Sequence, residues 1–450
     1  MIATIRTAFL FIAIASPLYA QEKQEVGSKL TLIRNVKVFD GKNKDLKDGP
    51  VLIEGNLIKA VGDQAVAVGA TVIDGGGRTL MPGLMDAHVH LALVRRPGEL
   101  RNDYDWMYNG AMSAREAHRM LLRGFTTVRD IGGPTVGLAR AIDEEGLPGP
   151  RIFSSGPYIT QTSGHGDFRN YNEPHPSVTG EQHLFDRLGW VGIADSPDEV
   201  RRATREALRR GAKQIKMMAG GGVSSPYDPL HTLQGSPAEF RAAVEAAKAW
   251  DTYVAVHAYT DEAVRMAVEA GVMSIEHGPF LTDKTMKLMA EKGVFLAPTA
   301  RISLTPPEKV GLPPSSLTAR KLREVNEGAK FQLRLAKLHG VRIVFSTDQF
   351  GAPENFPEQS NEFLTLAEHF SNYEVLQMAT TNVADLLKLS GKLHPYQDGP
   401  LGVIQEGAYA DLLIVEGNPL EDVTILANYE SNIRFIMKDG LVYKNTLTSQ

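Results

Sequence analysis

The sequence of 450 residues is 43% hydrophobic and 22% charged, the balance of an ordinary globular protein rather than of a disordered chain or a membrane bundle. A formal net charge of −5 and the lack of a long basic block exclude an electrostatic surface for nucleic acid. With no cysteine, the chain has no disulfide scaffold, no thiolate zinc site and no cysteine nucleophile. The length suggests roughly two or three domains, although an α/β barrel alone takes about 250 residues.

The first twenty residues have the pattern of a targeting segment. The basic residue Arg6 precedes an apolar run from Thr7 to Tyr19, and the small residue Ala20 precedes polar Gln21. We predict a secretory signal peptide at residues 1–20, cleaved near Ala20, and a mature protein that is secreted or periplasmic and free of the membrane. An uncleaved membrane anchor is the alternative, and the apolar run is short for a bilayer.

Short β-rich runs bounded by turn residues occur near both chain ends. They are Leu32–Val38, Val51–Glu54, Ala410–Val415, Ile433–Met437 and Leu441–Tyr443. Because two small β segments flank a long middle region, we predict one small β-sandwich domain built from both chain ends, residues 27–81 and 393–447.

The middle region, residues 82–392, alternates buried strands with helical stretches rich in alanine, arginine and glutamate, such as Glu199–Arg210 and Ala238–Ala249. The expected strands are Leu80–Met85, Phe125–Val128, Ile152–Ser155, Ile215–Met218, Tyr253–Val256, Ser274–Glu276, Val294–Leu296 and Ile343–Phe345. Eight repeated β-α units predict an α/β fold, a parallel (β/α)8 TIM barrel. A doubly wound sheet is the alternative, but no Gly-x-Gly-x-x-Gly pattern follows the first strand.

Long irregular segments follow several of these strands. They are residues 95–110, 158–190, 223–236, 301–316 and 349–360. In a barrel they are the loops of the active-site face, so we expect them to hold the groups that select the substrate.

His88 and His90 end the first barrel strand in the run Met81-Pro82-Gly83-Leu84-Met85-Asp86-Ala87-His88-Val89-His90. Side chains at i and i+2 of an extended strand point to the same face. The pair is therefore placed to chelate one metal ion, and the alternative is a polar strand end without a metal.

Four further polar residues lie at or just beyond the ends of other expected strands: Lys216, His257, His277 and Asp348. On a barrel, the carboxyl ends of different strands converge on one mouth, so these side chains are expected to meet His88 and His90. Singly, each has an ordinary structural explanation, such as a helix cap for Asp348. Their joint occurrence at five strand ends favours a site.

This set of six residues resembles the amidohydrolase superfamily, in its binuclear form with a carboxylated lysine. The resemblance covers nearly the whole mature chain, including Gly407-Ala408-Tyr409-Ala410-Asp411 near its end. Within the superfamily, Thr126–Asp130 and Ser163–Asp167 are similar to the imidazolonepropionase-related branch, which contains prolidase-like dipeptidases and ochratoxin-hydrolysing amidases. The spacing from Lys216 to Asp348 is most like the ochratoxinase-like group.

The resemblance implies a role for each ligand. His88, His90 and Asp348 hold the more buried of two divalent metal ions, and His257 and His277 hold the second. Carboxylated Lys216 bridges them. Zinc is the expected metal, because it suits imidazole and carboxylate ligands, and manganese or cobalt are possible substitutes.

The implied chemistry is hydrolysis by a hydroxide that bridges the two ions. Asp348 takes the proton of the attacking water and passes it to the leaving amine. His165 donates a hydrogen bond to the tetrahedral oxyanion, or is a solvent-exposed loop residue. Arg129 and Asp130 are expected to support the second strand end.

We therefore expect a secreted metal-dependent hydrolase of N-acyl amino acids or dipeptides, and a homo-oligomer, on the resemblance alone. An aromatic or proline residue is the expected C-terminal half of the substrate, as in ochratoxin A. Arg169 and Arg301 are both candidates for binding the substrate carboxylate. The alternatives are a cyclic-amide hydrolase like imidazolonepropionase, a lactonase, and a non-catalytic barrel that binds a ligand.

Overall fold

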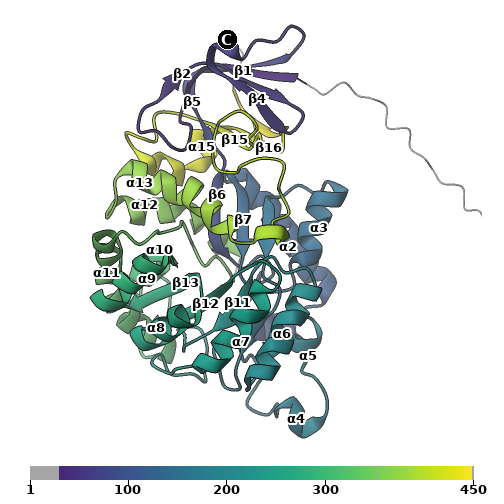
Figure 1. Ribbon diagram of the computed structural model, residues 1–450, viewed down its shortest axis with the longest axis vertical. Coiled ribbons are helices and arrows are strands. Elements are labelled where there is room, and N and C mark those ends of the chain that lie inside the picture. The colour runs from purple at the N-terminus through teal and green to yellow at the C-terminus, as the bar shows by residue number, and fades with distance from the viewer. Residues whose placement is uncertain (1–29, 352, 448–450) are drawn as a thin grey trace, which may run out of the picture.

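The computed structural model describes residues 30–351 and 353–447 (Figure 1). The predicted signal peptide at residues 1–20 lies outside this part of the chain. Within it, no helix combines the length and the apolar character needed to cross a membrane. One end of the molecule holds a sheet built from both chain ends, and the other end holds the alternating strands and helices.

The sheet from both chain ends has eight strands in the order β17-β16-β15-β5-β1-β3-β4, with β2 paired to β1. These strands are β1 (Leu30–Val38), β2 (Lys47–Asp48), β3 (Val51–Glu54), β4 (Leu57–Val61), β5 (Thr71–Pro82), β15 (Leu412–Val415), β16 (Ile433–Lys438) and β17 (Leu441–Asn445). The two chain ends meet where β15 runs antiparallel to β5, with Leu412 opposite Pro82. The predicted β-rich runs therefore pair with one another, whereas their division into a sandwich domain stays a prediction.

The middle of the chain forms two sheets of parallel strands, one of three strands in the order β6-β7-β8 and one of six in the order β10-β9-β11-β12-β13-β14. The strands are β6 (Leu84–Val89), β7 (Phe125–Asp130), β8 (Arg151–Ser154), β9 (Tyr158–Thr160), β10 (Val191–Ile193), β11 (Ile215–Met218), β12 (Val254–Thr260), β13 (Ser274–Phe280) and β14 (Phe295–Ala297). Their residues are almost all buried, as expected for strands covered on both faces.

Two predictions about these strands need correction. Leu80–Met85 is divided between β5 and β6 at Gly83, where a Cβ atom would lie 2.1 Å from Thr126 Oγ1. Residues 158–190 are predicted to be irregular, but they begin with β9, which pairs in parallel with β10 directly after them. The helices α4 (Pro176–Thr179) and α5 (Leu184–Arg187) lie between these two strands in the chain.

The predicted eighth strand, Ile343–Phe345, forms isolated bridges rather than a regular strand. Val344 N donates to Leu296 O at 3.0 Å and Ala87 N donates to Phe345 O at 2.8 Å, so the segment joins β14 to β6. The pairing with β6 is interrupted at Thr347, whose backbone N–H donates to the side chain of Asp86. It resumes where Asp348 N donates to His88 O at 2.8 Å. Asp348 then adopts the left-handed conformation, with φ at 52°.

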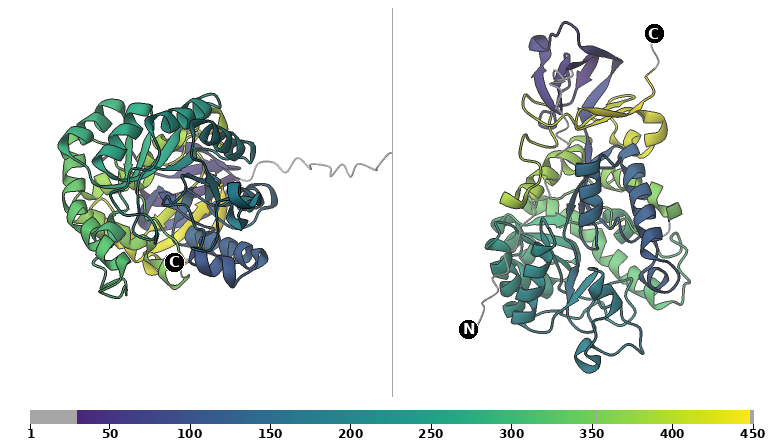
Figure 2. Two further views of the ribbon diagram at one scale, coloured as in Figure 1. Left: turned by 90° about the horizontal axis from the view of Figure 1, so that it is seen from below. Right: turned by 90° about the vertical axis from the view of Figure 1, so that its right-hand side faces the viewer.

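The helices lie around the outside of the parallel strands when the molecule is seen from below (Figure 2). The predicted helices Glu199–Arg210 and Ala238–Ala249 correspond to α6 and α7, and each begins with a serine cap followed by proline. The helices are α1 (Pro97–Asn102), α2 (Trp106–Leu122), α3 (Val136–Glu145), α4 (Pro176–Thr179), α5 (Leu184–Arg187), α6 (Pro197–Arg209), α7 (Pro237–Lys248), α8 (Asp261–Ala270), α9 (Asp283–Lys292), α10 (Ala300–Leu304), α11 (Leu317–His339), α12 (Glu362–Ala367), α13 (Asn372–Gln377), α14 (Val383–Lys388) and α15 (Tyr429–Asn432).

Candidate metal centre

His88, His90 and Asp348 form a compact cluster at the end of β6. One ligand atom from each of these residues lies within 4.8 Å of the others. His90 Nε2 is 3.2 Å from Asp348 Oδ1 and 3.3 Å from His88 Nε2. The two histidines therefore share a strand face, as their spacing predicts. Asp348, which follows residues 343–345, completes the group. Imidazole nitrogens and a carboxylate oxygen are the donors that zinc prefers.

The other predicted ligands lie beside this cluster. His257 is in β12 and His277 in the neighbouring β13, and their ring centroids are 4.7 Å apart. The ring of His277 is also 5.1 Å from that of His88. Lys216, in β11, is only 2% exposed, and its charge acts on His88, His277 and Asp348. All six predicted residues are thus brought to one place.

Each of the four histidines has one ring nitrogen held by an outer partner. His88 Nδ1 is 2.8 Å from Glu276 Oε2, and His277 Nδ1 is 2.9 Å from Thr299 Oγ1. The outer partner of His257 Nε2 is Gly221 O at 3.0 Å, and those of His90 Nδ1 are Gly132 O and the hydroxyl of Tyr158. Outer partners of this kind fix the tautomer and orientation of metal-binding imidazoles. They leave the second nitrogen of each ring for the centre.

The outer partner of His88 is itself part of a buried ion pair. The guanidinium of Arg129 donates to both carboxylate oxygens of Glu276 at 2.8 Å, and both side chains are fully buried. Arg129 also donates to the carbonyl of Ala87. Arg129 therefore supports His88 indirectly, because it holds the carboxylate of Glu276 that contacts the His88 ring. Sequence reasoning missed Glu276, although it directly precedes His277.

Burial sets the protonation of these side chains. Desolvation lowers the pKa of His88 and of His257 well below the ordinary value, and it lowers the pKa of His277 to about 4. It also lowers the pKa of Lys216 to about 8. Burial opposes ionisation of Asp348, but its interactions with the neighbouring His88 and His90 bring its pKa below the ordinary value. Neutral imidazoles and an ionised carboxylate are the forms that bind metal.

Backbone strain also concentrates here. His277, Thr299 and Asp348 have φ values of 71°, 48° and 52°, in the left-handed region that side chains other than glycine rarely adopt. His277 lies within β13, Thr299 lies just after β14, and Asp348 follows residues 343–345, so the three come from different parts of the chain. Strain of this kind persists where the surrounding structure enforces it, and it gathers at functional sites.

His165, the predicted oxyanion donor, is placed beside the second pair of ligands. Its ring is stacked on His257 at a centroid distance of 4.1 Å and an angle of 15°. Its Nδ1 atom lies 2.7 Å from Ser225 Oγ and 3.5 Å from Asp228 Oδ2. His165 therefore belongs to the wall of the site and is not a solvent-exposed loop residue.

The two arginines considered for the substrate carboxylate differ in their partners. Arg169 forms two hydrogen bonds with Asp167, at 2.8 and 2.6 Å. Arg301 donates one hydrogen bond to Glu358 at 2.7 Å, and its buried Nε atom has no partner among the described residues. Arg301 therefore has more hydrogen-bonding capacity left for a ligand.

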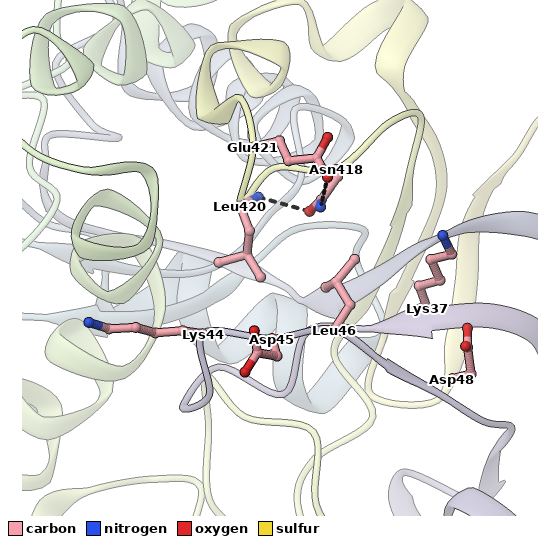
Figure 3. A pocket seen from close by; sticks show the side chains of 8 residues that line it. All are labelled: Lys37, Lys44, Asp45, Leu46, Asp48, Asn418, Leu420 and Glu421. Atoms are coloured by element: carbon pink, nitrogen blue, oxygen red, sulfur yellow. Dashed lines mark hydrogen bonds between the residues drawn. The ribbon is translucent and has the colours of Figure 1, made fainter.

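A separate pocket opens in the sheet built from both chain ends (Figure 3). It is lined by Lys37, Lys44, Asp45, Leu46, Asp48, Asn418, Leu420 and Glu421. None of these residues belongs to the histidine cluster. This pocket is therefore separate from the candidate site, which lies at the histidine cluster.

Residues 79–444 match the amidohydrolase family. The chain belongs to this family. Over 439 residues it is 30% identical to an ochratoxinase of Aspergillus niger, with 93% of this chain and 87% of the relative covered. The family is generally metal-dependent, which agrees with the cluster of His88, His90 and Asp348.

Two solved structures extend the comparison to peptide hydrolases. A prolidase in complex with N-methylphosphonate-L-proline is 35% identical, with a TM-score of 0.84 and coverage of 93% of this chain and 100% of that chain. An Xaa-Pro dipeptidase with methionine bound in its active site is 31% identical, with a TM-score of 0.80 and the same coverage. As a member of this family, the protein is accordingly a hydrolase of amide or peptide bonds. Its relatives have the TIM-barrel type of fold.

Proposed function

We propose that the protein is a binuclear metal-dependent hydrolase that cleaves the amide bond of N-acyl amino acids or dipeptides. The observation that carries the proposal is the orientation of the four histidines. Each ring has one nitrogen engaged by an outer partner, so the remaining nitrogens are available to a shared centre together with Asp348. His88, His90 and Asp348 would hold one ion, and His257 and His277 the other.

Lys216 is the residue that favours two ions over one. A buried ammonium group beside metal ions is unfavourable, whereas a lysine carboxylated by carbon dioxide is an anionic oxygen ligand. Carboxylation requires the neutral amine, and the burial of Lys216 favours this form because it lowers the pKa to about 8. A carboxylated Lys216 would bridge the two ions, for which zinc is the expected identity.

Two divalent ions supply Lewis acidity, which activates a water molecule and polarises the scissile carbonyl. Asp348 would accept the proton of the attacking water at its carboxylate and deliver it to the departing amine nitrogen. His165 would donate a hydrogen bond to the oxyanion, since its ring lies against His257 at the edge of the cluster.

For the substrate, we propose an N-acyl amino acid or dipeptide with an aromatic or proline residue as its C-terminal half. The relatives named as an ochratoxinase, a prolidase and an Xaa-Pro dipeptidase support this class. We further propose that Arg301, rather than Arg169, binds the substrate carboxylate, because Arg169 donates two hydrogen bonds to Asp167 whereas Arg301 donates one to Glu358.

The test is metal content by elemental analysis of native protein, of Lys216→Ala and of the control Lys248→Ala, whose lysine is exposed on α7. We expect about two metals per chain in the native protein and in the control, and a clear loss in Lys216→Ala. Protein incubated with ¹³C-bicarbonate should show a carbamate signal that Lys216→Ala lacks. One metal per chain, unaffected by Lys216→Ala, would overturn the bridged site. No metal at all would favour a non-catalytic barrel.

A substrate panel then separates the reaction classes. We expect turnover of dipeptides and N-acyl amino acids, including substrates with C-terminal proline and phenylalanine. Turnover of cyclic amides or lactones alone would support the alternative of an imidazolonepropionase-like or lactone hydrolase.

We also propose that the two parallel sheets close into one (β/α)8 barrel, which the bonds of Val344 and Ala87 to neighbouring strands support. The proposed export is tested by sequencing the N-terminus of mature protein, where a start near Gln21 is expected. Light scattering on the purified protein tests the expected homo-oligomer.

A further inference from the structure

The loop after β11 is built tightly against the candidate site. It contains the glycine run 220–222, and its ends are joined by a hydrogen bond from Gln234 N to Ala219 O at 3.0 Å. A Cβ atom at Gly222 would lie 2.0 Å from Cε1 of His165. The backbone of this loop therefore packs directly on the imidazole, with no space for a side chain.

A single buried lysine closes this loop from a distant helix. Lys321, near the start of α11, is 6% exposed, and its Nζ atom donates to three backbone carbonyls. The acceptors are Gly222 O at 2.8 Å, Ser225 O at 2.8 Å and Asp228 O at 2.7 Å. An ammonium group has three donors, so all of them are used. Three converging carbonyls form a cage for a cation, and the lysine fills it.

The loop held by Lys321 carries contacts to two residues of the site. Gly221 O accepts the outer hydrogen bond of His257, while Ser225 Oγ and Asp228 Oδ2 flank Nδ1 of His165. Asp228 also accepts a hydrogen bond from Gly222 N at 2.9 Å, which ties the two ends of the clamped stretch together. If the carbonyl cage opened, both imidazoles would lose their outer partners.

We propose that Lys321 is a positioning residue, whose ammonium group holds residues 220–228 in the shape that orients His257 and His165. It acts through the loop backbone and does not touch the reacting atoms. The effect of Lys321 on catalysis rests on the function proposed above. The effect of Lys321 on the conformation of residues 220–228 does not depend on that function.

Two substitutions separate charge from volume. Lys321→Met retains most of the side-chain volume and removes the three donors. Lys321→Ala leaves a carbonyl-lined space, which ethylammonium in the buffer can fill with the missing ammonium group. Lys330→Met is the matched control, because Lys330 lies on the same helix, is exposed and pairs with the exposed Glu327.

The primary readout is hydrogen exchange of residues 219–235 in metal-free protein. We expect Lys321→Met to raise exchange there at least about tenfold, since three charge-assisted hydrogen bonds are lost, while Lys330→Met behaves like native protein. In Lys321→Ala, ethylammonium should restore slow exchange, and it should have no effect on Lys321→Met. In metal-loaded protein, Lys321→Met should lower kcat and the content of the second metal while KM changes little.

Unchanged exchange of residues 219–235 in folded Lys321→Met would overturn the proposal. Should Lys321→Met fail to fold, Lys321→Ala purified with ethylammonium carries the same test, because dialysis removes the cation from folded protein. Exchange must then rise, and constant exchange would overturn the proposal. The exchange measurement uses neither metal nor substrate. It therefore tests the role of Lys321 even if the proposed reaction is wrong.

Discussion

Replacing Glu276 with glutamine tests whether a buried carboxylate orients His88. Glu276 Oε2 lies 2.8 Å from His88 Nδ1, and its oxygens accept hydrogen bonds from Arg129 at 2.8 Å and from Ser274 Oγ at 2.6 Å. A carboxylate only accepts, whereas an amide has one accepting oxygen and one NH2 group. In Glu276→Gln the NH2 group would face at least one donor, and Arg129 would lose the negative charge with which it pairs.

Two magnitudes follow from this geometry. Arg129 and Glu276 are both fully buried, so water cannot replace the lost interaction, and breaking such a pair destabilises a protein by about 3–5 kcal/mol. Loss of an outer partner weakens metal binding about 10–100-fold, which corresponds to about 1.4–2.7 kcal/mol. We expect both effects in Glu276→Gln.

The assays are urea unfolding of metal-free protein and a zinc titration against a competing chelator. Glu245→Gln is the control, because Glu245 is 66% exposed and pairs with Arg201 at 3.5 Å. An exposed pair contributes about 1 kcal/mol or less, so this control should change neither quantity by more than that. Folded Glu276→Gln with native zinc affinity would refute the assigned orientation of His88, even if its stability falls.

Three further substitutions probe other parts of the fold. Burial raises the pKa of Glu362 from 4.5 to about 7, so its protonation adds stability below pH 4.5 that is lost as the pH rises to about 7. Glu362→Gln should remove about 2.4 kcal/mol of the difference in unfolding free energy between about pH 5 and about pH 7.5, and an unchanged pH profile would contradict this. His165→Phe should keep the stacking on His257 and lower kcat about 10²–10³-fold at constant metal content, whereas unaltered steady-state turnover would exclude the oxyanion role. Arg151→Met should lower stability by about 3–5 kcal/mol in a thermal unfolding assay, because it strands the buried carboxylate of Asp411 in the sheet from both chain ends, and a loss below about 1 kcal/mol would argue against this pairing.

The candidate metal ligands follow from local patterns, and for this reason the sequence alone could propose a group of residues that the fold brings together. The alternation of side chains along a strand places His88 and His90 on one face whatever the rest of the chain does. Runs of buried residues between turns likewise indicate the neighbouring strands that carry His257 and His277, although β12 and β13 continue beyond these residues. The serine-proline starts of α6 and α7 belong to the same class of local signal.

The strands that differ from the prediction depend on contacts between segments that are distant in the sequence. Asp86 takes the N–H of Thr347, and the expected eighth strand is reduced to isolated bridges. The segment after β8 was predicted to be a loop on its length and irregular composition. It begins with the short strand β9, which forms because it pairs with β10 and β11, and no local pattern records such pairing.

The sequence by itself determined the repeated β-α units, the strands of both chain ends and the six candidate ligands, because these follow from periodicities and turns within about ten residues. Only the tertiary structure decided what orients those ligands. Arg129 meets Glu276 across 147 positions, and Lys321 meets Gly222 across 99. Such contacts exist only once distant strands and helices have packed, since a buried charge is stable only where the folded chain provides its partners.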